Sequence, residues 1–402
     1  ELGRAAAALP PLPSSFVAFT RTMLMLRSGA LGGRGLASRR LSSKICQNVT
    51  EAIGHTPMVQ LNRVVGPHCK AKRVLAKLEM QNPGGSVKDR IALGMIEAAE
   101  KRGEIHPDRT TIVEATSGNT GIGIAMVCAA RGYKCIIIMP QLPPMMERYI
   151  ICRKFGAHVH LTAGAPGAPM VENMFSHLSD LLANNKDYWS PLQFENRDNV
   201  LTHEETTGPE IWDQTDGEVD FFVAGAGTGG TMAGVGPFLK KKKPSIVNVC
   251  VEPSESRVMT GAASDKHTIV GIGAGIPLKF IEELDPGAEW RDGPRGAVDR
   301  FACASSEEST AWANRLAAEE GLLVGPSTGA ACKVACDIAS SDEAAGKTVV
   351  VVFPSSGIRY ITHPMWAGIK MEAASILAPP PDFSNAPPLL RWRSEEYVPP
   401  DP

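Results

Sequence analysis

The stretch Thr111-Ile112-Val113-Glu114-Ala115-Thr116-Ser117-Gly118-Asn119-Thr120-Gly121 passes from β-branched residues into a polar, glycine-containing turn. Thr111–Glu114 predicts a short strand, and Gly121–Arg131 predicts the helix that follows the turn. A hydroxyl of the turn could cap this helix, but hydroxyls together with an amide are more than a cap needs. A strand that enters a helix through a polar turn is the repeating unit of an α/β fold.

The same alternation continues on both sides of this stretch. Apolar, β-branched runs predict further strands at Arg73–Leu78, Lys134–Met139, Val159–Leu161, Asp220–Ala224, Val247–Glu252 and Thr348–Phe353. Helices are predicted between them at Val87–Arg102, Glu147–Phe155 and Ala330–Ala339. This order predicts an α/β protein with doubly wound parallel sheets.

Composition bounds the partners. The 402-residue chain is long enough for two domains, and 43% hydrophobic with 21% charged residues is ordinary for a globular protein. A net charge of −2 gives no reason to expect nucleic-acid binding, and no apolar run is long enough to predict a membrane span. Lys240–Lys243, just before Pro244, predicts a solvated helix end.

The nine cysteines have no CxxC spacing. This argues against a disulfide scaffold or a zinc site and favours a reducing compartment. Cys332 and Cys336 are interpreted as small buried side chains on a helix rather than as a metal pair. We therefore expect no metal.

The first 44 residues resemble a targeting segment. Between Leu2 and Thr50 the sequence has arginines but no Asp or Glu, and Ala, Ser, Leu and Gly are frequent. Because the chain starts with Glu1, translation could begin at Met23. We expect a mitochondrial transit peptide; a plastid peptide and a plain disordered leader are alternatives, with a cytoplasmic protein if the leader is not used.

Lys88 lies in Pro83-Gly84-Gly85-Ser86-Val87-Lys88-Asp89-Arg90, at the predicted start of a helix. A lysine in this place is a candidate Schiff-base nucleophile, and the preceding glycines would let the backbone approach a ligand closely. By itself, the position is more typical of a surface lysine on a helix.

A glycine loop follows the predicted strand at Asp220–Ala224. Gly225-Ala226-Gly227-Thr228-Gly229-Gly230-Thr231 would point backbone N–H groups and a helix N-terminus at an anion such as a phosphate. The loop also satisfies GxGxxG, and Glu252 ends the next strand about twenty residues later, as in a dinucleotide site. The loop alone leaves both NAD and another phosphate ligand open.

Two further polar turns complete a set. The turn Thr116–Gly121 follows a strand, where open α/β sheets bind ligands, and is a candidate site for a substrate carboxylate. Gly325-Pro326-Ser327-Thr328-Gly329 precedes a predicted helix, which by itself favours an N-cap, and is also a candidate partner of a cofactor ring nitrogen. An amine, a phosphate cradle, a carboxylate site and a ring partner are what pyridoxal phosphate chemistry on an amino acid requires.

At this point the chain resembles the cysteine synthases (O-acetylserine sulfhydrylases) of the cysteine synthase/cystathionine β-synthase family, which are fold type II pyridoxal phosphate enzymes. The resemblance runs from about Val49 to about Lys370. Besides the motifs above, it rests on Ile53-Gly54-His55-Thr56-Pro57, Gln193-Phe194-Glu195-Asn196, Val251-Glu252-Pro253, Gly271-Ile272-Gly273-Ala274-Gly275 and Pro354-Ser355-Ser356-Gly357.

The resemblance implies a role for each matching residue. Lys88 matches the Schiff-base lysine, Asn119 the residue that bonds the ring hydroxyl, and Ser327 the serine at the pyridine nitrogen. The phosphate loop is matched by Gly227, Thr228, Gly229, Gly230 and Thr231, and the substrate-carboxylate binders by Thr116, Ser117, Thr120 and Gln193. Glu252 then becomes a strand-end residue, and the NAD interpretation falls.

The resemblance also implies two α/β domains with pyridoxal 5'-phosphate between them, usually as a homodimer. The large domain is expected at residues 45–81 and 197–370, a small mobile domain at 82–196, and a Pro-rich tail at 371–402 with little regular structure after about Ala373. The Thr116–Thr120 turn is expected to close on the substrate.

The implied reaction is β-replacement of O-acetylserine by sulfide, giving cysteine and acetate, with Lys88 as base. β-Cyanoalanine synthase and cystathionine β-synthase are alternatives from the same family. A catalytically weak homologue that binds serine acetyltransferase is an alternative from another class, since family members form that complex.

Several positions depart from the family pattern. Arg197-Asp198 stand where Pro-Ala is usual, Pro326 replaces Ile, and Ile358 replaces Glu in Ser-Gly-Glu-Arg-Tyr. The segment Gln141–Met146 is longer than expected. These departures put the local loop geometry and the preferred nucleophile in doubt.

Overall fold

The structure is a computed structural model. It describes residues 45–141, 145–162, 170–282 and 297–376, with the side chains of 170–172 also outside the description. The predicted leader (residues 1–44) and the tail residues 377–402 lie outside the described residues.

One sheet has six strands in the order β1-β2-β10-β7-β8-β9. Their bounds are β1 Met58–Gln60, β2 Arg73–Leu78, β7 Phe221–Gly225, β8 Val247–Pro253, β9 Arg300–Ala304 and β10 Thr348–Phe353. All neighbours are parallel except β1 and β2. In the centre, β10 pairs with β2 from Thr348 opposite Arg73 to Phe353 opposite Leu78. The predictions for β2 and β10 are confirmed to the residue.

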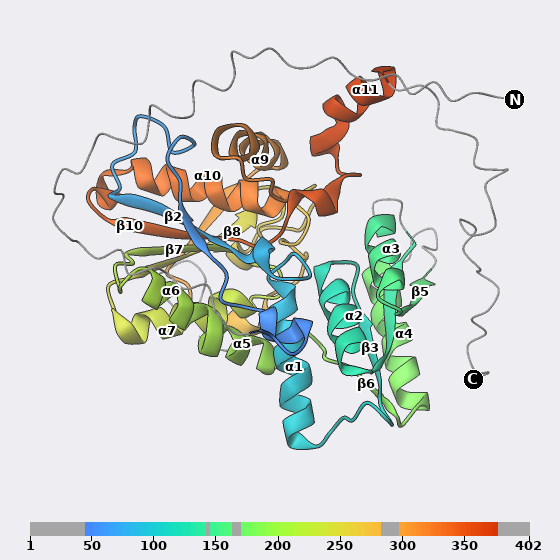
Figure 1. The fold of residues 1–402 in the computed structure, drawn as a ribbon. Helices are drawn as coiled ribbons and strands as arrows, with labels where there is room; N and C mark the ends of the chain where they lie inside the picture. Colours follow the sequence, from blue (N-terminus) through green and yellow to red (C-terminus); the bar gives the residue numbers. More distant parts are fainter. Residues whose placement is uncertain (1–44, 142–144, 163–169, 283–296, 377–402) are drawn as a thin grey trace, which may run out of the picture. The chain divides into compact units, whose positions relative to one another are not determined.

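Helices cover both faces of this sheet (Figure 1). On one face, α9 (Ser306–Glu320) and α10 (Pro326–Ser340) pack over Val349, Val351 and Phe353 of β10. On the other face, α6 (Gly208–Gln214) and α7 (Gly230–Lys242) pack over Val350 and Val352. Because side chains alternate along a strand, a continuous apolar strand such as β10 requires cover on both sides.

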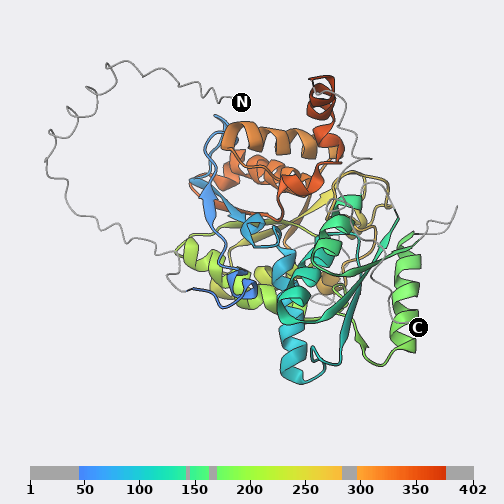
Figure 2. The ribbon, with the colours of Figure 1, turned by 45° about the vertical axis from the view of Figure 1, so that its right-hand side comes forward.

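The second sheet has four parallel strands in the order β5-β4-β3-β6. Their bounds are β3 Thr111–Ala115, β4 Lys134–Pro140, β5 His158–Thr162 and β6 Tyr188–Trp189. On one face pack α1 (Lys88–Arg102), α2 (Asn119–Arg131) and α3 (Met146–Lys154), and on the other packs α4 (Met170–Asn184) (Figures 1 and 2). The two sheets with helices on both faces confirm the doubly wound α/β fold.

The remaining helices are mostly short. They are η2 Val49–Ala52, η3 Glu79–Gln81, α5 Asp198–Thr202, η5 His203–Thr207, η6 Val258–Thr260, α8 Lys279–Glu282, η7 Asp342–Ala344, η8 Gly357–Tyr360, η9 Pro364–Trp366 and α11 Ala367–Ile376. α11 continues past Ala373, where little regular structure was expected. The residues from Glu372 to Ile376 include good helix formers and no proline, so the helix has no local reason to stop earlier.

Several smaller predictions can be compared with the structure. α7 ends at Lys242, as the basic run predicted, and Lys240 pairs with Asp299 at 2.8 Å. Cys332 and Cys336 are buried on α10, as expected for small core side chains. The described helices include none long and apolar enough to cross a membrane. Within the same residues, no three His, Cys, Asp or Glu side chains are grouped so as to hold a metal ion.

Candidate active site

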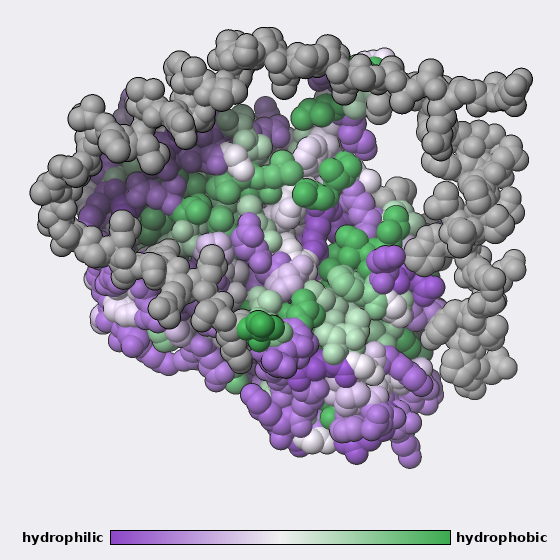
Figure 3. Space-filling view, in the orientation of Figure 1, coloured by the Kyte–Doolittle hydropathy of each residue, from purple (hydrophilic) through white to green (hydrophobic). Residues whose placement is uncertain are grey.

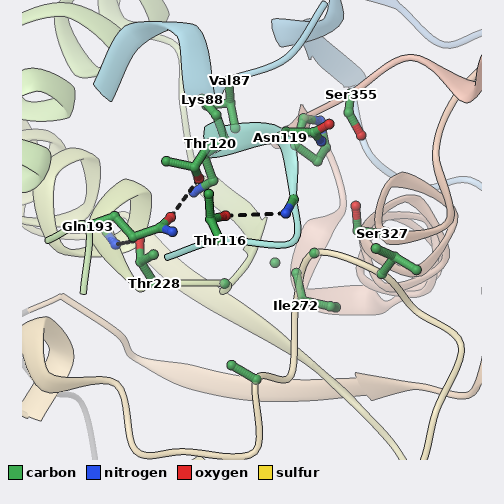
Figure 4. Close-up of a pocket in the computed structure, with 18 of the residues that line it drawn as sticks. Val87, Lys88, Thr116, Asn119, Thr120, Gln193, Thr228, Ile272, Ser327 and Ser355 are labelled. Carbon is green, nitrogen blue, oxygen red and sulfur yellow. Dashed lines mark hydrogen bonds between the residues drawn. The ribbon is translucent and has the colours of Figure 1, made fainter. Parts of the chain in front are cut away.

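A cavity of about 310 Å³ gathers the residues that the sequence singled out (Figure 4). They arrive from the start of α1, the β3–α2 turn, the segment after β6, the β7–α7 loop and the first turn of α10. The lining includes Lys88, Thr116, Ser117, Asn119, Thr120, Gln193, Gly227, Thr228, Gly229, Gly230, Thr231 and Ser327. Both sheets therefore contribute to one pocket, at the carboxyl ends of their strands, where open α/β sheets bind ligands.

Lys88 is the first residue of α1 and is half-buried at the pocket wall. Desolvation by the surrounding protein lowers the pKa of its amine to about 8. A Cβ on Gly84 would lie 2.5 Å from Asp89 Oδ1, and one on Gly85, at φ +80°, would lie 2.9 Å from Arg359 Nη2. The close approach that these glycines permit is therefore to side chains of the protein, not directly to a ligand as expected.

The turn Thr116–Gly121, called the hydroxyl turn below, lines the pocket with its residues Thr116 to Thr120. α2 begins at Asn119 rather than at Gly121, and its N-cap is Gly118, with no side-chain cap. Thr120 Oγ1 donates to Gln193 Oε1 at 2.6 Å, and both side chains are buried (Figure 4). The helix-cap interpretation of this turn is wrong, because the backbone of Gly118 occupies the cap position.

A residue that the sequence analysis missed holds the segment carrying Gln193. Glu114, buried in β3, accepts hydrogen bonds from Ser190 Oγ at 2.9 Å, Leu192 N at 3.0 Å and Gln193 N at 3.3 Å. Burial nevertheless raises the pKa of this carboxyl to about 7. The segment needs such support because Leu192 adopts φ +50°, which is unfavourable for a branched side chain. In the sequence, the only sign of this role is that Glu114 is a glutamate in an otherwise β-branched predicted strand.

The glycine loop cannot carry side chains at its critical positions. Gly229, the N-cap of α7, has φ +87°. A Cβ on Gly227 would lie 2.5 Å from the carbonyl oxygen of Gly271, and one on Gly230 would overlap Asn199 Oδ1. The first turn of α7 thus lies close to the pocket, where the helix dipole favours an anion, and within it Gly230 N donates to Thr228 Oγ1 at 3.3 Å.

A second missed residue supports the same loop. His203 is buried, and its Nε2 lies 3.3 Å from Thr231 Oγ1 while its Nδ1 lies 2.9 Å from Thr207 Oγ1. Burial lowers the pKa of this imidazole well below its ordinary value, so it is neutral. The ring therefore holds the hydroxyl of Thr231 beside the helix N-terminus. No local sequence pattern announces this role.

Ser327 is buried in the first turn of α10 and lines the pocket (Figure 4). The N-cap of α10 is Gly325, again without a side-chain cap, so Ser327 does not serve as the cap that its position suggested. Glu252 lies outside the pocket lining, and its carboxylate accepts from Met259 N at 2.9 Å. A ribose partner for a dinucleotide is therefore absent from the described lining of the pocket.

The pocket fits pyridoxal phosphate. Its described lining contains Lys88 and Arg148 but no Asp or Glu, so an anion meets positive groups only. A phosphate would take the α7 N-terminus, where Gly227 and Gly230 have no room for a Cβ, and Lys88 supplies an amine of lowered pKa. Ser327 offers the ring nitrogen a neutral hydroxyl. Apolar side chains, Met174, Phe175, Phe194 and Ile276, complete the wall.

The departures from the family pattern leave the pocket intact. Asp198 begins α5 and pairs with Arg102 at 2.9 Å, while Gln193 stays in the pocket. Pro326 is the first residue of α10, where its missing N–H costs no hydrogen bond. Ile358 is 65% exposed. Of the long segment Gln141–Met146, residues 142–144 lie outside the described residues.

Comparison with known proteins agrees with this site. The sequence profile of the pyridoxal-phosphate dependent enzymes matches residues 49–355. A cysteine synthase of Staphylococcus aureus is 43% identical over 329 residues, covering 81% of this chain and 99% of its own. Cysteine synthase A of Escherichia coli is 41% identical over 340 residues, covering 82% of this chain and 98% of its own.

A solved structure supports the fold as well. O-acetylserine sulfhydrylase isoform 3 of Entamoeba histolytica superimposes with a TM-score of 0.74 at 36% identity, covering 81% of this chain and 93% of that one. The chain therefore belongs to the family of pyridoxal-phosphate dependent enzymes that includes the cysteine synthases, and its cofactor is pyridoxal 5'-phosphate.

Proposed function

We propose that this enzyme makes L-cysteine from O-acetyl-L-serine and sulfide, releasing acetate. The observation that carries the proposal is the single pocket in which the amine of Lys88, the glycine loop, Ser327 and the hydroxyl turn meet. The relatives named above, cysteine synthases and an O-acetylserine sulfhydrylase, support the same reaction.

In this proposal each side of the pocket holds one part of the cofactor. Lys88 Nζ would hold it covalently, residues Gly227 to Thr231 would hold its phosphate, Asn119 would face its ring oxygen, and Ser327 would face its pyridine nitrogen. When bound, the cofactor supplies a conjugated ring that stabilises negative charge on the substrate α-carbon. A hydroxyl at the ring nitrogen, instead of a carboxylate, leaves that nitrogen unprotonated, which favours β-elimination over transamination.

The hydroxyl turn orients the substrate. The hydroxyl groups of Thr116 and Ser117, the side-chain amide of Gln193 and the backbone N–H of Thr120 would donate to the substrate carboxylate at the N-terminus of α2. The hydrogen bond between Thr120 and Gln193 links the two segments that must meet around this carboxylate. Held in this way, the α-carbon of the substrate faces Lys88.

Lys88 then moves the proton. As a free amine, Nζ would remove the proton from the substrate α-carbon while the C–O bond to acetate breaks at the β-carbon. Sulfide forms the new C–S bond, and the proton returns to the α-carbon from Nζ. A neutral amine is required for the first step, and a pKa of about 8 makes it available at mildly alkaline pH.

The test is visible absorbance of the purified protein. We expect a yellow protein whose band shifts on adding O-acetylserine and returns fastest with sulfide, with cysteine as product. Lys88→Ala should lose the yellow band and cysteine formation, whereas Lys101→Ala, an exposed lysine of the same helix, should keep both.

Other outcomes refute parts of the proposal. An unchanged band in Lys88→Ala contradicts the covalent role of this lysine. Faster turnover of cysteine with cyanide than of O-acetylserine with sulfide would instead assign β-cyanoalanine synthesis, and efficient use of homocysteine would assign cystathionine synthesis. A protein that binds the cofactor but turns over none of these substrates would be a binding homologue.

We also propose that the enzyme is a homodimer. Exposed large apolar side chains support this, among them Ile358, Ile361, Ile369, Met371 and Ile376, and Figure 3 shows apolar side chains gathered on the face that it presents. Light scattering after size-exclusion chromatography measures the mass directly.

A complex with serine acetyltransferase is also proposed. It is tested by adding a peptide of that enzyme's C-terminus and measuring competition with O-acetylserine.

Two further proposals concern the organisation of the chain. Residues 82–196 are proposed as a small mobile domain against the remainder, supported by the four-stranded sheet formed between Thr111 and Trp189; hydrogen exchange with and without substrate tests it. Residues 1–44 are proposed as a mitochondrial leader on composition. A fusion of these residues to a fluorescent protein should reach mitochondria, and plastid or cytoplasmic fluorescence contradicts it.

A further inference from the structure

We propose that Arg359 and Tyr360 are positioning residues that fix the side-chain amide of Asn119 in one orientation, with an N–H directed to the cofactor. The inference rests on the proposed role of Asn119 at the ring oxygen of pyridoxal phosphate. The proposed function assigns no part in cofactor binding to Arg359 or Tyr360.

Two hydrogen bonds define the arrangement. Arg359 Nη1 donates to Asn119 Oδ1 at 3.1 Å, and Asn119 Nδ2 donates to the Tyr360 hydroxyl at 3.0 Å. A guanidinium has donors and no acceptor, so only the oxygen of the amide can face it. Arg359 therefore excludes the flipped amide, which would place N–H against N–H.

The side-chain amide of Asn119 has one N–H bond left for a ligand. The Nδ2 group has two N–H bonds, and Tyr360 takes one of them. The second stays available to a ligand in the pocket that Asn119 lines. Because Asn119 Oδ1 accepts from a charged group, the amide is polarised and its remaining N–H becomes a stronger donor. The ring oxygen of pyridoxal phosphate is the acceptor that this donor fits.

Tyr360 is itself held on both sides. It is buried, and its hydroxyl lies 2.9 Å from Ser355 Oγ. Figure 4 shows Ser355 near Asn119. The guanidinium carbon of Arg148 lies 5.1 Å from the centre of the Tyr360 ring. The ring therefore has little freedom to turn away from Asn119.

Arg359 is enclosed by the segment that precedes Lys88. Its Nη2 lies 2.9 Å from where a Cβ of Gly85 would be, and the buried carboxyl of Asp89, whose pKa burial raises to about 7, opposes its charge once ionised. Asp89 in turn accepts from Gly84 N at 2.6 Å. Gly85, which precedes Lys88 in the chain, thus leaves room for the guanidinium that orients Asn119.

The arrangement joins the two sheets. Asn119 follows β3 of the four-stranded sheet, whereas Arg359 and Tyr360 follow β10 of the six-stranded sheet. Nearby, Thr362 N donates to Glu147 Oε1 of α3 at 2.7 Å, which holds the same segment against the four-stranded side. A residue that faces the cofactor is thereby fixed from across the pocket and not only by its own helix.

The test measures cofactor binding and needs no substrate. Protein freed of cofactor is titrated with pyridoxal 5'-phosphate, and the apparent Kd and the absorbance maximum of the bound form are recorded. Arg359→Met should raise Kd at least about tenfold and Tyr360→Phe about threefold, as expected for a charged and a neutral hydrogen bond. Both should shift the absorbance maximum in the direction that Asn119→Ala shifts it.

A double variant separates positioning from general damage. With Asn119→Ala already present, Arg359→Met should weaken binding by less than about twofold, because the amide it orients is gone. Arg359→Lys keeps a donor and should recover part of the absorbance shift. The controls Arg300→Met and Tyr188→Phe, remote from the pocket lining, should leave both readouts unchanged.

Additive effects of Arg359→Met and Asn119→Ala would overturn the proposal, as would wild-type Kd and absorbance in Tyr360→Phe. The smaller Tyr360→Phe change keeps the ring and carries the test if Arg359→Met fails to fold. Failure to make cysteine with the coupling intact refutes only the proposed reaction. Loss of the coupling in an enzyme that makes cysteine refutes only the positioning role.

Discussion

Arg90 offers the sharpest test of how the start of α1 is held. It lies two residues after Lys88, and its guanidinium makes paired hydrogen bonds to two carboxylates. Nε and Nη2 donate to Glu79 at 2.7 and 2.8 Å, and Nη1 and Nη2 donate to Glu210 at 2.7 Å each. The side chains of Arg90, Glu79 and Glu210 are 2%, 0% and 11% exposed, so water cannot replace these bonds. Arg90→Met removes all of them at nearly constant volume.

The magnitude follows from the pKa of Glu210. Burial opposes its ionisation, but hydrogen bonds and charge from Arg90, with Lys77, outweigh burial and lower this pKa from 4.5 to about 2. A shift of that size corresponds to about 3 kcal/mol of folding stability near pH 7. Lys77 retains part of it, while Glu79 loses its only charged hydrogen-bond partner among the described contacts. We expect Arg90→Met to lower the free energy of unfolding by about 3–5 kcal/mol, the range for breaking a buried ion pair.

Urea unfolding followed by circular dichroism measures this cost. Arg90→Lys should fall between wild type and Arg90→Met, because it keeps the charge and loses the paired geometry. Arg300→Met breaks the exposed pair with Glu343 and should cost less than about 1 kcal/mol. The contribution of a carboxyl with a lowered pKa is present above pH 4.5 and is lost as the pH falls toward about 2, so the gap between wild type and Arg90→Met should narrow on acidification. A loss no larger than in Arg300→Met, or a gap independent of pH, refutes this account of the network.

Further predictions concern the pocket. Gly230→Ala should weaken pyridoxal 5'-phosphate binding at least about tenfold in a titration of cofactor-free protein, because its Cβ would overlap Asn199. Thr120→Val removes the bond to Gln193 and should raise KM for O-acetylserine about tenfold with a smaller change in kcat; an unchanged KM contradicts the carboxylate role. Burial raises the pKa of Glu114 from 4.5 to about 7, so this group destabilises the fold as the pH rises from about 4.5 to 7. The free energy of unfolding of Glu114→Gln, measured in urea, should therefore rise relative to that of the wild type by up to about 3 kcal/mol between these two pH values. If the free energies of unfolding of the two proteins change in parallel with pH, the assignment is refuted.

Local sequence predicted the elements whose environment is uniform. β10 was predicted to the residue because an apolar, β-branched strand covered on both faces needs no further information. β2, which contains Arg73 and Lys77, was predicted with the same accuracy at its bounds. Helix starts were less accurate. α2 begins at Asn119 and α10 at Pro326, earlier than predicted, with Gly118 and Gly325 at the N-cap positions and no side-chain cap.

The candidate site shows the same division. Its direct ligands lie in short runs whose composition differs from ordinary turns, so Lys88 and the glycine loop could be found in the sequence and supported by resemblance. Residues that act through another residue gave no such signal. Glu114 reaches Gln193 across 79 positions, and Arg359 reaches Asn119 across 240. Their partners are defined only when the strands are paired.

By itself, the sequence determined the α/β class, the family and the groups that would meet pyridoxal phosphate, because periodicity, glycine and hydroxyl content are local properties of a chain. Tertiary structure alone decided that Lys88 has a pKa of about 8, that Gly84 and Gly85 admit Asp89 and Arg359, and that Asn119 has one orientation. These properties depend on desolvation and on donors brought from distant segments. Both arise only when the two sheets close around one pocket.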